Sequence, residues 1–102
     1  LISGGENVYP AEIENVILGH PKVADVGVVG IPSKKWGESP LAVIVRGDES
    51  LTEKEVLDHC EGKLAPFKVA KAVEFVEEIP RNPSGKILKR ELRERFSYNA
   101  PD

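Results

Sequence analysis

The chain has 102 residues, of which 40% are hydrophobic and 30% charged, so its composition is globular and its length is that of about one small domain. A formal net charge of -3 gives no overall attraction to nucleic acid or to an anionic membrane surface. No apolar run approaches the roughly 18 residues of a membrane span, and no signal peptide opens the chain, so we expect a cytoplasmic protein.

The first predicted helix covers residues 10–18. Pro10 suits the first helical position, and Glu12 complements the partial positive charge of a helix N-terminus. Apolar side chains then recur at helical spacing, namely Ile13, Val16 and Ile17. Gly19 follows them and predicts where the helix ends.

Two strands are predicted next, over residues 23–31 and 40–46. Both segments are rich in β-branched side chains, and Pro21 and Pro32 bound the first of them. The connection is long for a tight hairpin. Residues 32–38 are therefore expected to form an exposed loop, which is a common place for functional residues.

A second helix is predicted to begin after Thr52, which forms a capping box with Glu55. Leu51 and Val56 occupy the hydrophobic positions that flank such a box, and Gly62 marks the end of the helix. The start of this helix is therefore unusually well specified.

A third strand is predicted over residues 72–79, and a last helix follows Gly85. The apolar face of that helix repeats every fourth residue, at Leu88, Leu92 and Phe96. The predicted fold class is therefore α+β, a small three-stranded sheet covered by about three helices in the order α-β-β-α-β-α. The sheet can be antiparallel if the first strand lies between the other two, while parallel pairings remain open.

The side chains that most often bind metals are sparse. Cys60 is the single cysteine and cannot form an internal disulfide, and its place on the apolar face of a helix favours a buried structural role. His59 is adjacent to it and points in a different direction, and His20 is distant in sequence. We therefore predict no metal site.

A basic loop precedes the last helix, with the sequence PRNPSGK at residues 80–86. Two prolines and a glycine favour an exposed turn that presents Lys86. Basic residues continue from it at helical spacing, namely Lys86, Lys89, Arg90 and Arg93. This basic stripe predicts an anion site, and the alternative is a solvated face on which Glu91 and Glu94 pair with the bases.

A second candidate lies before the first helix, in the sequence SGGEN at residues 3–7. Gly4 and Gly5 permit positive φ angles and let a ligand approach the backbone closely. The spacing is not that of a phosphate-binding loop or a dinucleotide fingerprint, so a flexible turn is the alternative.

Together the two segments resemble the C-terminal domain of the adenylate-forming acyl-CoA synthetase and ligase superfamily. SGGENVYPAEIE at 3–14 is similar to the family's glycine-rich segment, and PRNPSGKILKREL at 80–92 is similar to its Pro-x-x-x-x-Gly-Lys signature. GIPSKKWGE at 30–38 and LAPFKVAK at 64–71 resemble family segments in the same order. The resemblance spans nearly the whole chain.

The resemblance implies the mobile C-terminal domain, or lid, of an ATP-dependent, AMP-forming enzyme. Such an enzyme joins a carboxylate to ATP, with Mg²⁺, and then transfers the acyl group to the thiol of coenzyme A. The catalytic lysine of the first step matches Lys86, and the face used in the second step matches Gly4, Gly5 and Glu6. A fatty or general acyl substrate is expected from the amino-acid sequence of the glycine-rich segment.

The resemblance also implies contacts with coenzyme A. Trp36 matches an aromatic position beside the pantetheine tunnel, although it could instead cover the core of its own domain. Phe67, Lys68 and Lys71 match positions that stack the adenine and pair with the phosphates of the coenzyme in some members. Val69 departs from the basic residue of some relatives, which puts the nucleotide contact in doubt.

We expect residues 1–102 to be this lid alone, with the large N-terminal domain that binds ATP and the acyl group absent from the chain. The isolated chain is then expected to be essentially inactive, and its partners to be its own N-terminal domain, a small carboxylate, ATP and coenzyme A. Two alternatives remain open. One is the lid of an adenylation domain that serves a carrier protein, and the other is a freestanding module that binds an anionic partner.

Overall fold

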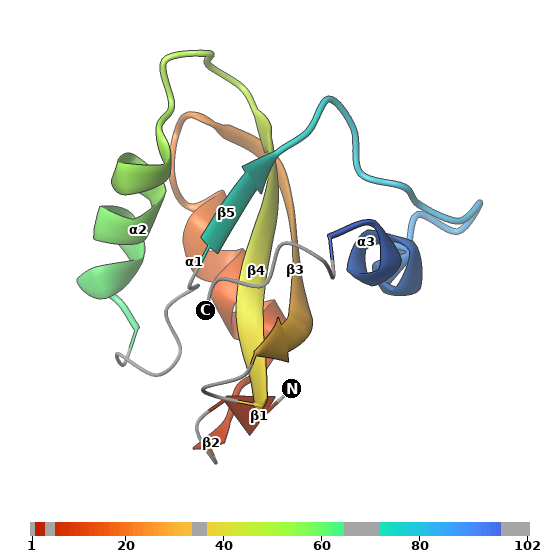
Figure 1. Ribbon diagram of the computed structural model, residues 1–102. Helices are drawn as coiled ribbons and strands as arrows, with labels where there is room; N and C mark the ends of the chain where they lie inside the picture. Colours follow the sequence, from red (N-terminus) through yellow and green to blue (C-terminus); the bar gives the residue numbers. More distant parts are fainter. Residues whose placement is uncertain (1, 4–5, 34–36, 65–71, 97–102) are drawn as a thin grey trace.

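The computed structural model describes residues 2–3, 6–33, 37–64 and 72–96. These residues form the elements labelled in Figure 1: β1 (Ile2–Ser3), β2 (Glu6–Asn7), α1 (Pro10–Leu18), β3 (Val23–Ser33), β4 (Gly37–Arg46), α2 (Glu53–Glu61), β5 (Ala72–Phe75) and α3 (Lys89–Phe96). The longer elements follow the predicted order, so the α+β class is confirmed. The two-residue strands β1 and β2 were not predicted.

The sheet is mixed, and β4 lies at its centre. β4 pairs antiparallel with β3 along most of its length, and residues 41–44 of β4 pair in parallel with β5. β1 pairs antiparallel with the start of β4 through Ser3 and Gly37. The antiparallel alternative, with the first predicted strand in the middle, is therefore wrong. The connection through α2 returns the chain to β4 in the parallel sense, as a helical crossover does.

The sheet is buried on both faces, because successive side chains of a strand point in opposite directions. Val26 and Val28 of β3 pack against α1 and α2. Val29 and Ile31 pack against α3 and the segment that precedes it. Figure 1 shows α1 and α2 on one side of the sheet and α3 on the other. The domain thus has three layers, with the sheet between α1 and α2 on one side and α3 on the other. One hydrophobic core lies on each face of the sheet.

The bounds of two predicted segments change. β3 continues to Ser33 and β4 begins at Gly37, so most of the expected loop at 32–38 belongs to strands, and residues 34–36 lie outside the described part. β5 ends at Phe75, earlier than predicted, because its ladder with β4 ends there. The chain then crosses toward the face that carries α3, where Ile79 is buried.

An ion pair joins the start of α2 to the segment that follows α1. Thr52 caps α2 as predicted, since its side-chain oxygen accepts a hydrogen bond of 3.2 Å from the backbone N–H of Glu55. The carboxylate of Glu55 also lies 3.2 Å from the ammonium of Lys22, in the segment after α1. The hydrogen bond from Lys22 is the main reason why the pKa of Glu55 falls below its ordinary value of 4.5.

A carboxyl whose pKa is lowered by folding stabilises the folded state above its ordinary pKa, and that contribution is lost as the pH falls through the lowered value. Lys22→Met should therefore lower the free energy of unfolding most at neutral pH and least at acidic pH, below the lowered pKa of Glu55. Urea denaturation at several pH values measures this. Lys63→Met, which removes an exposed charge without breaking this pair, is the control. A Lys22→Met effect that stays constant with pH would contradict the prediction.

Candidate functional site

The predicted basic loop, residues 80–86, lies within a closed hairpin-like turn that spans residues 80–88. At its base the N–H of Leu88 donates to the carbonyl of Pro80 at 2.9 Å. Arg81 and Ile87 pair next to them as an isolated antiparallel bridge. The loop therefore begins and ends at adjacent points on the domain.

Asn82 organises the tip of this loop. Its side-chain Oδ1 accepts hydrogen bonds from the Ser84 N–H at 3.1 Å, the Ser84 hydroxyl at 2.7 Å and the Lys86 N–H at 3.0 Å. Its backbone N–H donates to the carbonyl of Lys86 at 2.9 Å, and its carbonyl accepts from Gly85 at 2.9 Å. Gly85 has a φ of 87°, which a residue with a side chain rarely adopts. Asparagine and glycine thus give the turn its shape.

Lys86 combines a fixed backbone with an exposed side chain. Its N–H and its carbonyl both bond to Asn82, whereas its ammonium has no hydrogen-bond or ion-pair partner among the described residues. α3 begins only at Lys89, so Lys86 precedes the first helical turn. The result is a positive charge on a flexible stem that projects from an ordered turn, as the loop sequence predicted.

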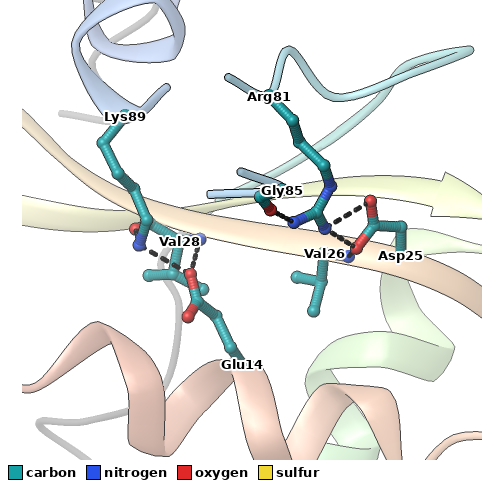
Figure 2. A network of polar contacts seen from close by, with 7 residues as sticks. All are labelled: Glu14, Asp25, Val26, Val28, Arg81, Gly85 and Lys89. Atoms are coloured by element: carbon teal, nitrogen blue, oxygen red, sulfur yellow. Dashed lines mark hydrogen bonds and ion pairs between the residues drawn. The ribbon is translucent and has the colours of Figure 1, made fainter. Parts of the chain in front are cut away.

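Arg81 fastens the loop to β3 (Figure 2). Its Nη1 donates to the carbonyl of Gly85 at 2.7 Å, and its Nη2 lies 2.7 and 2.8 Å from the two carboxylate oxygens of Asp25. Oδ1 of Asp25 also accepts the N–H of Val26 at 2.9 Å. The guanidinium is therefore shared between the strand and the loop.

Asp25 reaches the loop because β3 is irregular there. Val23 pairs with Arg46 and Asp25 with Val45, so two residues of β3 oppose one of β4, which is a β-bulge at Ala24. Without the bulge, alternation would turn Asp25 to the same side as Val23, which packs against α1 and α2. The bulge turns the carboxylate to the side that carries Arg81.

The predicted basic stripe is not a single surface. The ammonium of Lys89 lies 2.6 Å from Oε2 of Glu14 and 2.6 Å from the carbonyl of Val28, and the same Oε2 accepts the N–H of Val28 at 2.8 Å (Figure 2). The Lys89 side chain therefore turns toward the edge of the sheet and is only partly exposed. Arg90 pairs with Glu94 at 3.3 Å, as the alternative of a solvated face expected.

An open hollow of about 310 Å³ lies beside α3. It is lined by Pro32, Arg90, Arg93 and Glu94. A carboxylate stands among its arginines, so the hollow is not uniformly positive. It is separate from the contacts that hold the Lys86 loop.

Most of the residues assigned to coenzyme A lie outside the described part of the chain. They are Gly4, Gly5, Trp36, Phe67, Lys68 and Lys71. For Glu6 only the backbone is described, and it pairs with Ser3 between β2 and β1. These assignments stay predictions.

The remaining reactive side chains have structural surroundings. Cys60 is buried as predicted, and burial raises the pKa of its thiol, which keeps it protonated and unreactive. His59 Nε2 lies 2.8 Å from the carbonyl of Val16 and its ring packs edge-on against His20. Among the described residues no three His, Cys, Asp or Glu side chains are grouped so as to hold a metal. No helix in that part of the chain is long and apolar enough to cross a membrane.

Comparison with known proteins gives consistent matches. Residues 12–86 match the AMP-binding enzyme C-terminal domain family. The chain is 52% identical over 101 residues to the long-chain-fatty-acid–CoA ligase FadD13 of Mycobacterium tuberculosis, covering 99% of this chain and 20% of that protein. It is 55% identical over 94 residues to a 2-succinylbenzoate–CoA ligase of Bacillus cereus, covering 92% and 19%. The chain thus spans about a fifth of the length of these curated relatives.

Solved structures agree. A fatty acyl CoA synthetase from Mycobacterium tuberculosis has a TM-score of 0.93 and 51% identity, over 99% of this chain and 20% of that one. Apo MatB from Rhodopseudomonas palustris has a TM-score of 0.91 and 44% identity, over 97% and 20%. The o-succinylbenzoate CoA synthetase MenE from Bacillus subtilis has a TM-score of 0.85 and 43% identity, over 90% and 19%.

The role of Asn82 in the loop can be tested directly. Asn82→Ala removes the acceptor of the Lys86 N–H, so that amide should exchange with solvent roughly tenfold faster or more, since a lost hydrogen bond costs about 1 kcal/mol and two further bonds go with it. Hydrogen exchange followed by NMR measures this. Ser84→Ala, which removes only the hydroxyl donor, is the control. Equal exchange in Asn82→Ala and wild type would show that the turn holds its shape without this side chain.

Proposed function

The chain belongs to the AMP-binding enzyme C-terminal domain family, and from this we propose that residues 1–102 are the mobile lid of an AMP-forming acyl-CoA synthetase. The complete enzyme would convert a carboxylate and ATP into an acyl-adenylate and pyrophosphate. It would then transfer the acyl group to the thiol of coenzyme A and release AMP. The relatives are CoA ligases about five times as long as this chain, which supports a large N-terminal domain as its partner.

Lys86 is proposed to act in the first step, and the observation that carries this proposal is its exposed ammonium on a hydrogen-bonded turn. As a carboxylate oxygen bonds to the α-phosphorus and the bond to pyrophosphate breaks, negative charge spreads over the phosphoryl oxygens. An ammonium held nearby stabilises that charge, and as a point charge on a flexible stem it follows the moving oxygens. Mg²⁺ would arrive with the phosphates of ATP, which are among its usual ligands.

The glycine-rich segment is proposed to act in the second step, where Gly4, Gly5 and Glu6 would line the path of the pantetheine arm. β1, which precedes the glycine pair, meets β4 at Gly37, whereas Asp25 meets β4 at Val45. At about 3.3 Å per residue these points lie roughly 26 Å apart along the strand. A separation of this size supports a lid that turns between the two half-reactions to present one end and then the other.

Coenzyme A is favoured over a carrier protein as the thiol donor, because the similar proteins are CoA ligases. MatB has been solved with ATP bound and MenE with its acyl-adenylate intermediate, which supports adenylate chemistry in this family. Trp36, Phe67, Lys68 and Lys71 would contribute to the coenzyme site. A fatty or general acyl substrate remains our proposal, and its choice would be made by the pocket of the larger domain. Without the larger domain, the chain should have essentially no ligase activity.

The role of Lys86 predicts a selective defect. In the complete ligase, Lys86→Ala should slow acyl-adenylate formation by about 100-fold or more, the usual cost of losing one transition-state donor. Thioester formation from preformed adenylate should stay close to wild type. Pyrophosphate exchange and single-turnover thioesterification measure the two steps, with Lys54→Ala on α2 as the control. Equal losses in both steps would show that Lys86 has no step-specific role.

The glycine-rich face predicts the opposite defect. Gly5→Leu adds a side chain where the pantetheine arm is proposed to pass, so thioesterification should fall more than adenylation. The control is Gly62→Leu, because a side chain at Gly62 would enter open space. The same two assays apply. If Gly5→Leu slows both steps alike, the glycine pair is a structural turn and the tunnel assignment is withdrawn.

A further inference from the structure

The peptide bond that leads into Lys86 is held at both of its polar atoms. Its carbonyl oxygen belongs to Gly85 and accepts a hydrogen bond of 2.7 Å from Nη1 of Arg81. Its N–H belongs to Lys86 and donates to Oδ1 of Asn82 at 3.0 Å. Asn82 lies within the loop, so its contact shapes the loop only internally. The contact from Arg81 differs, because the same guanidinium also binds Asp25 of β3 and so links the peptide to the sheet.

Only a guanidinium matches this arrangement. Nη1 of Arg81 reaches the Gly85 carbonyl while Nη2 reaches both oxygens of Asp25, and these donors are fixed in one plane. A lysine presents one nitrogen and could not reach both partners in the same geometry. Arg81 and Asp25 are partly exposed, with side-chain exposures of 38% and 30%, so simple charge attraction between them is weakened by solvent. The main effect of this bridge is therefore to fix the position of the loop relative to β3, and its contribution to stability is small.

Asp25 is itself held in place. Its Oδ1 accepts the N–H of Val26, and the bulge at Ala24 turns it toward the loop. The loop is anchored in this way to a strand that is hydrogen-bonded to the centre of the sheet. Without this anchor the tip would keep its internal hydrogen bonds and could still tilt as a unit.

We propose that Arg81, held by Asp25, is the positioning residue that fixes the direction of Lys86 relative to the rest of the lid; this inference rests on the adenylation role proposed for Lys86. The lysine then reaches the α-phosphate through movement of the whole domain. The backbone at Lys86 does not move relative to the rest of the domain during this step. Misplacement of a catalytic group by about 1 Å can cost up to 100-fold in rate, so loss of the anchor should be visible in the chemical step.

The experiment compares four variants of the complete ligase: Arg81→Gln, Arg81→Lys, Asp25→Asn and the double variant Arg81→Gln with Asp25→Asn. Both Arg81 variants should lower kcat of adenylation by roughly 10- to 100-fold, with little change in the KM for ATP. Arg81→Lys keeps the charge and should still be impaired, since it cannot bridge. Asp25→Asn should have a smaller effect of the same kind, because its amide oxygen can still accept the Val26 N–H.

Two readouts separate positioning from other roles. Thioester formation from preformed adenylate should be unchanged, and the double variant should be no slower than Arg81→Gln, because residues that act through one contact are not additive. Lys54→Gln, which breaks the exposed ion pair with Asp58, is the matched control and should leave both steps unchanged. Hydrogen exchange at the Lys86 amide should stay near the wild-type level in the Arg81 variants as in the control, because its bond to Asn82 lies within the loop and does not need the anchor.

Several results would overturn the inference. An increase in the KM for ATP together with additive effects would mean that Arg81 contacts the nucleotide directly. Equal losses in both half-reactions would mean that the bridge only supports the fold, and a wild-type rate in Arg81→Lys would mean that charge alone is needed. If the Arg81 variants do not fold, the same criteria apply to Asp25→Asn. A Lys86→Ala variant with normal adenylation would instead overturn the proposed function, whatever the Arg81 variants do.

Discussion

The outer edge of β3 imposes a constraint on the rest of the domain, since the backbone groups of an edge strand need hydrogen-bond partners. Charged side chains provide them here (Figure 2). The carboxylate of Asp25 accepts the N–H of Val26, and Glu14 and Lys89 bond to the N–H and the carbonyl of Val28. Each carboxylate also forms an ion pair with a basic side chain from the C-terminal segment, Asp25 with Arg81 and Glu14 with Lys89. These backbone groups at Val26 and Val28 are thus paired without a further strand.

This closure also joins the layers of the fold. Glu14 comes from α1 and Lys89 from α3, so their ion pair connects helices on opposite sides of the sheet across its edge. Gly27 lies between the two bonded valines, and a Cβ there would come within 3.2 Å of Leu92 Cδ1. The missing side chain lets α3 approach β3 closely. Along the chain, Lys86 lies between Arg81 and Lys89, and both of these side chains are bonded to β3.

Such a construction suits a domain whose proposed task is to present different groups at different times. A lysine on a loose loop would lose its alignment each time the lid turned, whereas one on an anchored loop keeps its place in the body. The same sheet carries β1 at the far end of β4, next in sequence to the glycine pair. A body that carries two groups at separated ends can serve two half-reactions by rotation, because turning the body brings one end and then the other to the substrate.

Much of this protein follows from local sequence. Pro10 and Gly19 mark α1, Thr52 and Glu55 mark the start of α2, and the loop carrying Lys86 is recognisable from its prolines and glycine. These signals act over a few residues, so no knowledge of the fold is needed to read them.

Local sequence could not predict three features: the strand order, the inward turn of Lys89 and the ion pair between Asp25 and Arg81. The ion pairs join residues 56 and 75 positions apart, and the bulge at Ala24 reverses the face that alternation assigns to Asp25. Tertiary structure decided them, because an ion pair forms between whichever charged groups the packed elements bring together, and spacing along the chain carries no record of that proximity.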